Sequence, residues 1–337
     1  MIRRVAVASP QSGLTPLRHT VIATPTALYS THKTTNPMIT EITQKTVEFL
    51  SFASVARAAA KALRHGKIRL GIVMLALAST VTAETLVIPG SGNPEFILRE
   101  LADGYNARQT RHRVIIPPSI GTSGALRELT EGTATMGRVG RPLSGAELNL
   151  GLTYQPIGRD PVVFVGGAGV TATDLSAQQA IDVFTGKIHN WRELGGKPGA
   201  IRAIGREKSD ASRQAIMKEI KAFEGLHYHD GVKVVMLDPQ LIELLDRFPM
   251  SFSFLNRSAL SAAKTKLVVF KLDSVEPDAE NVKTGRYRLW TEIGLIFRKS
   301  TLTDAGRDFI QYIESPRGVE LLQQHGLLPA KAIPANH

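Results

Sequence analysis

Three short segments of this 337-residue chain combine glycine with hydroxyl, amide or carboxylate side chains where a predicted strand gives way to a predicted helix. They are residues 90–93, 121–124 and 206–212. The first N–H groups of a helix have no partner within the helix, and the positive end of its dipole lies there, so such a segment suits an anion. The same residue types also cap helices that bind nothing, and for one segment alone capping is the simpler interpretation. Three such segments, together with two arginines, favour a shared anion-binding site.

The two arginines are Arg141 and Arg206. A guanidinium group stays charged and presents a fork of N–H donors that matches the oxygens of a tetrahedral oxyanion. Arg138 lies close by in the sequence and is better interpreted as a structural or surface residue. The full set of candidate binding residues is Ser91, Gly92, Asn93, Thr122, Ser123, Gly124, Arg141, Arg206, Asp210 and Ser212.

Two carboxylates, those of Asp160 and Asp210, accompany these segments. A carboxylate beside a bound oxyanion repels it unless a proton lies between the two. A site that contains such a carboxylate therefore favours protonated anions, such as hydrogen phosphate, over sulfate. The alternative role for Asp210 is a helix N-cap that pairs with Arg206 or Arg213.

Short β-rich stretches alternate with helical patterns from residue 84 onward. The predicted strands are residues 85–88, 112–116, 161–165, 201–204, 233–237, 266–270 and 292–297. The predicted helices are residues 95–108, 125–131, 176–184, 212–223, 239–247, 303–314 and 316–325. This alternation predicts an α/β fold with parallel sheets covered by helices on both faces, and such sheets bind ligands at the carboxyl ends of their strands.

Motifs that carry enzymatic or metal chemistry are missing from the sequence. It has no Walker lysine pattern, nucleophile elbow or HExxH segment, and residues 90–95 lack the third glycine of a dinucleotide fingerprint. The absence of cysteine excludes disulfides and thiolate metal sites. His227 and His229 have no third ligand nearby in the sequence, so we expect them at the surface. We therefore expect a binding protein with no cofactor, no metal and no catalytic activity.

Positive charge is concentrated at the N-terminus. The formal net charge is +11, but residues 1–83 contain ten Lys or Arg and two Asp or Glu, whereas residues 84–337 contain 31 and 28. The remainder of the chain is nearly balanced, so the sequence does not predict a nucleic-acid partner.

A secretory leader accounts for much of this pattern. Arg64, Lys67 and Arg69 precede an apolar run over residues 70–78, and small residues follow up to Ala83. The run is shorter than the about 20 apolar residues that a membrane span needs. We expect a signal peptide over residues 67–83, cleavage after Ala83 and a periplasmic location, with residues 1–66 an extension whose role stays open.

The order of several segments resembles the phosphate-binding-type solute-binding proteins of ABC transporters, which are type II periplasmic binding proteins. Residues 184–191, with the sequence FTGKIHNW, resemble the pattern F-x-G-x-I-x-N-W of that family and are the most specific segment. The other matching segments are residues 90–92, 120–125, 140–143, 160–164, 309–318 and 326–329.

This resemblance implies a two-lobed periplasmic-binding-protein-like α/β fold, in which each lobe is a mixed sheet flanked by helices and two hinge crossovers join the lobes. On this basis we expect one lobe over residues 84–162 and 260–337, and the other over residues 163–259. It further implies a monomer that captures phosphate, or a related tetrahedral oxyanion, in the cleft between the lobes. The partner would be an inner-membrane ABC permease.

Two positions depart from the family pattern. The positions that match its ligand-binding residues are Asn93, Thr122, Arg206 and Ser212, with the backbone of Ser123 and Gly124. Arg141 stands where well-studied members have an aspartate that accepts the phosphate proton, and Asp210 replaces a serine. Asp210 then either opposes the anion or takes over as proton acceptor, so phosphate is the first expectation and another tetrahedral oxyanion stays open.

Three other functions are compatible with parts of the sequence. An oxyanion sensor outside transport would have the same site. A phosphatase on the same scaffold would need a metal or nucleophile that the sequence does not show. A DNA-binding regulator would need a helix-turn-helix before the domain; residues 45–66 are helical in pattern and basic, but the apolar run that follows argues against this function.

Overall fold

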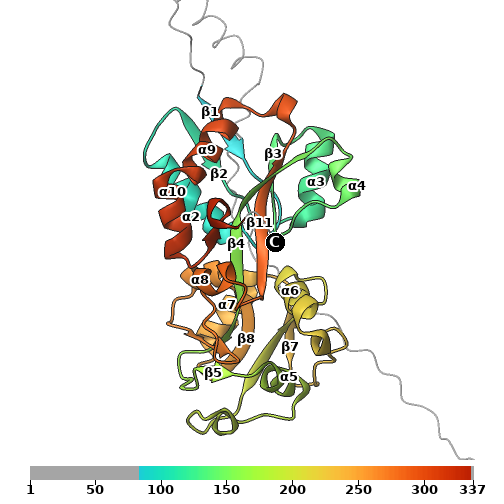
Figure 1. Ribbon diagram of the computed structural model, residues 1–337, viewed down its shortest axis with the longest axis vertical. Helices are drawn as coiled ribbons and strands as arrows, with labels where there is room; N and C mark the ends of the chain where they lie inside the picture. Colours follow the sequence, from blue (N-terminus) through green and yellow to red (C-terminus); the bar gives the residue numbers. More distant parts are fainter. Residues whose placement is uncertain (1–82, 335–337) are drawn as a thin grey trace, which may run out of the picture. The chain divides into compact units, whose positions relative to one another are not determined.

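The computed structural model describes residues 83–334 of the chain, shown as coloured ribbon in Figure 1. The expected extension, the expected signal peptide up to residue 82 and the basic segment over residues 45–66 therefore lie outside the described residues. Among residues 83–334, no helix is both long enough and apolar enough to cross a membrane.

Strands and helices alternate along most of the described chain. The strands are β1 (Glu84–Val87), β2 (His112–Ile115), β3 (Met136–Val139), β4 (Thr153–Gly166), β5 (Asp174–Leu175), β6 (Arg202–Arg206), β7 (Lys233–Val235), β8 (Ser251–Asn256), β9 (Val268–Val269), β10 (Lys271–Leu272), β11 (Trp290–Phe297) and β12 (Leu328–Pro329). The α-helices are α2 (Glu95–Asn106), α3 (Gly121–Glu131), α4 (Gly145–Leu148), α5 (Ala177–Thr185), α6 (Ala211–Glu219), α7 (Asp238–Arg247), α8 (Ala279–Lys283), α9 (Asp304–Glu314) and α10 (Pro316–Gln324). Short 3₁₀ turns include η3 (Lys221–Phe223) and η4 (Arg257–Ala262).

The predicted elements correspond to real ones, but five strands escape the prediction: the two-residue strands β5, β10 and β12, and two longer buried strands. One is β3, and the other is β8, whose two serines are fully buried between phenylalanines instead of facing water. The hydroxyl of Ser253 donates to the carbonyl of Ile204 in the neighbouring strand, which satisfies its polar group. Residues 121–124 form the first turn of α3, not a loop before it, because small hydroxyl residues are tolerated where the helix N–H groups are still free.

The central sheet is mixed, so the expectation of purely parallel sheets is wrong, while the mixed two-lobed α/β fold implied by the family resemblance is confirmed. Its strand order is β3-β11-β4-β8-β6-β7. Strands β6, β7 and β8 are parallel, but β4 pairs antiparallel with both β11 and β8. The reason is connectivity: β4 carries the chain from one half of the molecule to the other, and the chain returns through β11 in the opposite direction. Figure 1 shows β4 running between the two groups of elements.

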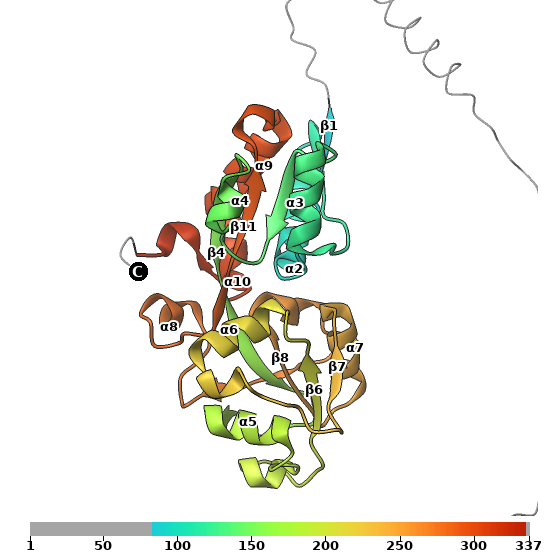
Figure 2. The same cartoon turned by 90° about the vertical axis from the view of Figure 1, so that its right-hand side faces the viewer.

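Two large apolar clusters lie on either side of this crossover. One includes Leu98 and Phe309 and takes its members from β1, β2, α2, β11, α9 and α10. The other is centred on aromatic side chains, among them Phe164, Trp191 and Phe270. Trp191, from the most specific segment of the sequence, stacks on Phe270 with ring centroids 5.8 Å apart and donates its indole N–H to the carbonyl of Met250 at 3.0 Å. The FTGKIHNW segment therefore supplies packing for the second core. Figure 2 shows α5 and α6 on this side of the molecule and α2 and α3 on the other.

The second core extends further along the chain than the expected lobe boundary at residue 260. Phe270, Val282 and Leu289 all belong to the cluster that contains Trp191. The chain returns from the second core to the first where β11 begins, near residue 290, because β11 pairs with β3.

Candidate anion-binding site

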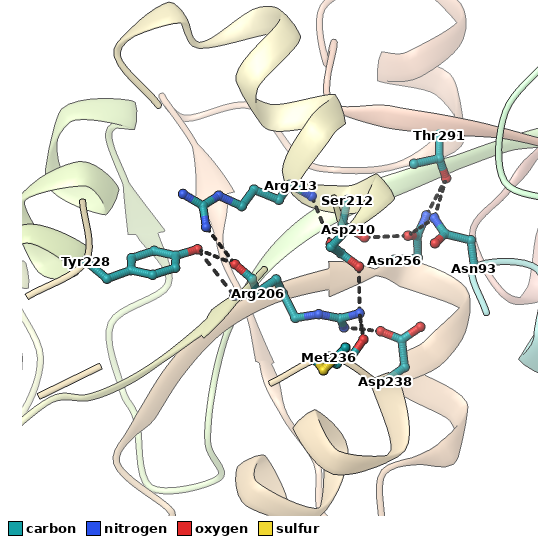
Figure 3. Close-up of polar contacts among 10 residues, drawn as sticks. All are labelled: Asn93, Arg206, Asp210, Ser212, Arg213, Tyr228, Met236, Asp238, Asn256 and Thr291. Atoms are coloured by element: carbon teal, nitrogen blue, oxygen red, sulfur yellow. Dashed lines mark hydrogen bonds and ion pairs between the residues drawn. The ribbon is translucent and has the colours of Figure 1, made fainter. Parts of the chain in front are cut away.

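Arg206, the last residue of β6, is the centre of a buried charge cluster (Figure 3). Its side chain is 3% exposed. One terminal nitrogen donates to a carboxylate oxygen of Asp210 at 2.6 Å and to the carbonyl of Met236 at 3.2 Å, and the other donates to Asp238. The Nε of Arg206 is also buried, and no residue of the described chain accepts its hydrogen. The cluster thus combines one guanidinium with two carboxylates and one unmatched donor.

Asp210 has the capping role that was one of its two predicted alternatives. It is the N-cap of α6, and its side chain accepts the backbone N–H of Arg213 at 3.0 Å. Burial raises the pKa of Asp210 to about 6, with Arg206 opposing that rise and Asp238 adding to it. For Arg206 burial works to lower the pKa, but the two carboxylates outweigh burial and the pKa is raised, so Arg206 stays charged. Of these two groups, Asp210 is therefore the one that exchanges its proton in the range near pH 6.

Ser212, two residues into the same helix segment, joins a second and uncharged cluster. Its hydroxyl donates to the side-chain oxygen of Asn256 at 2.7 Å. The amide nitrogen of Asn93 donates to the same oxygen at 2.8 Å, and the nitrogen of Asn256 donates to Thr291 at 2.6 Å. Figure 3 shows the four side chains converging from different elements. The candidate residues Asn93 and Ser212 are therefore brought together through a residue that the sequence did not single out.

The turn over residues 90–93 is held in place by the buried Arg138, which confirms its structural role. The Arg138 guanidinium donates to the carbonyls of Ser91 and Pro117 and to the carboxylate of Glu95. Burial lowers the pKa of Arg138 to about 10, which leaves it charged at neutral pH. Arg138 thus anchors the turn through charge-assisted hydrogen bonds in a dry environment.

Gly92 brings this turn close to the charge cluster. A Cβ placed on Gly92 would lie 3.8 Å from a carboxylate oxygen of Asp238 and 3.4 Å from the hydroxyl of Ser119. Gly140 allows the turn to pack closely, because a Cβ there would lie only 3.1 Å from the hydroxyl of Ser91. The candidate residues Ser91, Gly92 and Asn93 therefore adjoin the Arg206 cluster from the side of the first core.

The second predicted segment lies next to the same turn but makes fewer direct contacts. Ser119 donates its hydroxyl to the carbonyl of Gly90 at 3.2 Å and accepts the N–H of Gly121 at 3.3 Å, so it ties the two segments together. No side chain caps the N-terminus of α3. Thr122 is half-buried, Ser123 is exposed and Gly124 is buried. Within residues 83–334, no hydrogen bond joins these three residues to the Arg206 cluster.

The side chain of Arg141 pairs with a residue outside the two clusters. Its guanidinium makes two hydrogen bonds of 2.7 Å to the carboxylate of Glu147, and its side chain is half exposed. The Arg141 hydrogen bonds lower the pKa of Glu147 to about 2. Glu147 also completes a capping box with Ser144 at the start of α4. The Ser-x-x-Glu spacing is the signal in the sequence that could have indicated this pairing.

Three residues of the two clusters were missed by the sequence prediction. Asp238 opens α7 three residues after the end of β7, and Asn256 ends β8, so both follow or end strands on the same sheet edge as Arg206. The carboxyl-end rule for parallel strands could have identified these two. Thr291 is in an antiparallel strand, where the rule gives no signal.

The carboxylate of Asp160 and the two histidines lie outside the clusters. Asp160 is fully buried in β4, where the N–H and hydroxyl of Ser258 donate to its carboxylate. Burial raises the pKa of Asp160 to about 7. His227 and His229 are exposed, as predicted. Between residues 83 and 334, no group of three His, Asp or Glu side chains is arranged to hold a metal ion.

The chain is similar in sequence to several proteins that are named as phosphate-binding proteins. The chain is 27% identical over 209 residues to the phosphate-binding protein PstS of Bacillus subtilis strain 168, an alignment that covers 58% of this chain and 64% of that protein. It is 21% identical over 253 residues to PstS of Borreliella burgdorferi, covering 72% and 89%. The alignment thus spans slightly less than two thirds of the length of the Bacillus protein.

Solved structures share the fold. A phosphate ABC transporter substrate-binding protein from Clostridium perfringens, with bound phosphate, superposes with a TM-score of 0.62 at 24% identity, covering 73% of this chain and 99% of that one. An ABC-type phosphate transport receptor from Vibrio cholerae gives a TM-score of 0.53 at 19% identity, covering 72% and 99%.

The family assignment rests on the chain as a whole. Residues 76–317, well over half of the sequence, match the PBP superfamily domain. The resemblance predicted from the order of the segments is thereby confirmed, and the protein belongs to the PBP superfamily.

Proposed function

We propose that this protein captures hydrogen phosphate, or a related protonated tetrahedral oxyanion, and delivers it to an ABC transporter. The buried Arg206 carries the proposal, because it holds an unmatched Nε–H at the point where β6 ends and α6 begins. A helix N-terminus and a buried guanidinium both favour an anion. The names of the relatives, which are phosphate-binding proteins, support the same ligand.

The two carboxylates around Arg206 support a protonated ligand. With Asp210 and Asp238 both ionised, the cluster has a net charge of −1, so it repels an anion that has no proton to donate. Hydrogen phosphate can offer its proton to a carboxylate while its other oxygens accept from N–H groups. Sulfate at neutral pH has no such proton. We therefore assign the proton acceptor to Asp210 or Asp238.

The division of the chain supports capture between two lobes. We place one lobe over residues 84–161 and 290–334 and the other over residues 162–289, which follows the two apolar cores. Candidate residues then come from both sides: the turn over residues 90–93 from the first lobe, and Arg206 and Ser212 from the second. A ligand held by both sides favours the arrangement in which they are close together.

Binding without turnover is the expected outcome. The hydroxyl of Ser212 donates to the neutral amide of Asn256, which is no general base, and a serine nucleophile needs one. We further propose that the protein acts as an exported monomer with a membrane permease as its partner. This last step rests on the relatives and on the leader pattern of the sequence.

Calorimetric titration shows which anion the protein binds. Purified protein is titrated with phosphate and, in parallel, with arsenate, sulfate, molybdate and tungstate at pH 7.5. We expect tight binding of phosphate and arsenate and none of sulfate. A preference for molybdate, tungstate or sulfate would contradict the protonated-anion site, and absence of binding by every oxyanion would contradict the proposed function.

A further inference from the structure

Asn256 uses its whole hydrogen-bonding capacity inside the protein. Its side-chain oxygen accepts from Ser212 at 2.7 Å and from Asn93 at 2.8 Å. Its nitrogen donates to the hydroxyl of Thr291 at 2.6 Å and to the carbonyl of Asp160 at 3.4 Å. A backbone carbonyl only accepts, so the nitrogen of the amide must face Asp160. The residue is 3% exposed, which makes each of these bonds costly to leave unmade.

The partners of Asn256 belong to two functional groups of residues. Asn93 and Ser212 come from two of the segments predicted to bind the anion, and they lie on opposite sides of the crossover. Thr291 and Asp160 belong to β11 and β4, the two paired strands that carry the chain between the cores. Asn256 therefore connects both candidate ligand segments to the crossover strands through one buried amide, and Asn93 also donates directly to the hydroxyl of Thr291 at 3.4 Å. We call these four side chains, with the carbonyl of Asp160, the Asn256 hub.

Ser212 provides the connection between ligand occupancy and the hub. A serine hydroxyl has one hydrogen to donate, and in this structure it points to Asn256. If an oxyanion accepts that hydrogen, the hydroxyl rotates, and Asn256 keeps Asn93 as the remaining donor to its oxygen. No covalent bond changes in this step. The hydrogen bond between Asn93 and Asn256, which crosses from one lobe to the other, then becomes the sole side-chain donor contact to that oxygen.

From these contacts we infer that Asn256 is a positioning residue that couples anion capture to the relative placement of the two lobes. This inference rests on the proposed function for the identity of the ligand. The effect of Asn256 on the placement of the two lobes does not depend on that function. Without the amide, Asn93 and Ser212 lose their common partner. The two ligand segments are then no longer held at fixed positions relative to one another. The crossover strands keep only the weaker direct hydrogen bond from Asn93 to Thr291, at 3.4 Å.

The inference is tested by measuring the distance between two spin labels, one in each lobe. The full chain contains no cysteine, so Arg127→Cys and Lys221→Cys introduce the only two labelling positions. Both residues are exposed; Arg127 lies in α3 beside the first core and Lys221 in η3 beside the second. Electron–electron distance distributions are recorded without phosphate and with saturating phosphate. In the otherwise unchanged protein we expect phosphate to narrow the distribution.

Asn256→Ala is compared with Ser253→Ala, a matched control. Ser253 is fully buried in the same strand, and its hydroxyl makes one hydrogen bond outside the hub, to the carbonyl of Ile204. We expect Asn256→Ala to broaden the distance distribution and to weaken phosphate binding by about tenfold or more, whereas Ser253→Ala changes neither beyond about twofold. Equal behaviour of the two variants would overturn the inference.

Asn256→Asp adds a readout that a purely structural role does not predict. An ionised aspartate accepts from Asn93 and Ser212 but cannot donate to Thr291, whereas a protonated one can do both. The affinity of Asn256→Asp relative to the unsubstituted protein should therefore recover as the pH falls from 8 to 5. A ratio independent of pH would overturn the inference.

The two proposals fail in different ways. If the unsubstituted protein binds no phosphate, the proposed function fails, but the ligand-free distance distributions still test the hub. A broader distribution for Asn256→Ala than for Ser253→Ala would support the hub in that case. Identical ligand-free distributions would overturn it.

Discussion

Arg206 and Asp210 stand four residues apart, on either side of the junction between β6 and α6, and form an ion pair of 2.6 Å whose side chains are 3% and 6% exposed. Asp238 from the start of α7 adds a second carboxylate to the same guanidinium. A buried pair of this kind costs much free energy of desolvation and is therefore weak evidence for a role in stability alone. Its place at the convergence of the candidate segments is better explained by binding.

Arg206→Ala should abolish measurable anion binding, because it removes the buried charge and leaves two carboxylates that repel the ligand. Loss of one partner from a buried ion pair also destabilises a protein by about 3–5 kcal/mol. Arg202→Ala is the control: Arg202 begins the same strand, is exposed, and its guanidinium lies over the ring of Phe248. Calorimetry at a temperature where both variants are folded checks this. Unchanged affinity in Arg206→Ala would remove Arg206 from the site.

Asp238→Asn and Asp210→Asn should reduce the discrimination against sulfate. Each substitution removes one negative charge from the cluster and leaves Arg206 in place. We expect detectable sulfate binding in at least one of the two variants, together with weaker binding of phosphate. Titration of both variants with both anions measures the ratio. If sulfate stays excluded from both, the discrimination arises from another part of the site.

The free energy of unfolding should fall as the pH rises from about 4 to about 7. Burial raises the pKa of Asp210 to about 6 and that of Asp160 to about 7, whereas both ionise near 4 in the unfolded chain. The folded state therefore holds more protons than the unfolded state in this window, and its stability is largest below the unfolded pKa. Denaturant unfolding of the ligand-free protein at several pH values measures the slope.

Asp160→Asn distinguishes the pH dependence of stability that arises from Asp160 from the pH dependence that arises from other titrating groups. The amide can accept from the N–H of Ser258 and donate to its hydroxyl, so the local contacts are retained without a titrating group. The free energy of unfolding of the variant minus that of the unsubstituted protein should therefore be larger at pH 8 than at pH 4. A difference between the two proteins that is the same at both pH values would contradict the raised pKa of Asp160.

Arg141→Ala should change phosphate affinity by less than about twofold. Its guanidinium is committed to Glu147, and exposed ion pairs contribute about 0–1 kcal/mol to stability. The sequence predicted Arg141 in the binding site, whereas the structure pairs its side chain with Glu147. This variant tests which of these two roles Arg141 has. A tenfold loss of affinity in calorimetry would show that Arg141 leaves Glu147 to contact the ligand.

Local signals in the sequence predicted most elements and four of the seven side chains in the two clusters. Arg206, Asp210 and Ser212 were found because strand ends and helix starts have characteristic residue types. Strand β8 was missed because its two buried serines look like solvent-facing residues in the sequence, although only Ser253 donates to a neighbouring strand, and Asn256 was missed with it. The partner of Arg141 was missed, although the Ser-x-x-Glu spacing of Ser144 and Glu147 is the signal of a capping box. Contacts such as that between Asn93 and Asn256 join residues 163 positions apart, which spacing along the chain cannot reveal.

We propose that the Arg206 cluster accepts a protonated tetrahedral oxyanion. Paired calorimetric titrations with phosphate and sulfate, on the unsubstituted protein and on Arg206→Ala, are the decisive experiment. We expect phosphate binding that depends on Arg206 and no sulfate binding by the unsubstituted protein. Phosphate binding that survives in Arg206→Ala, or sulfate bound as tightly as phosphate, would contradict it.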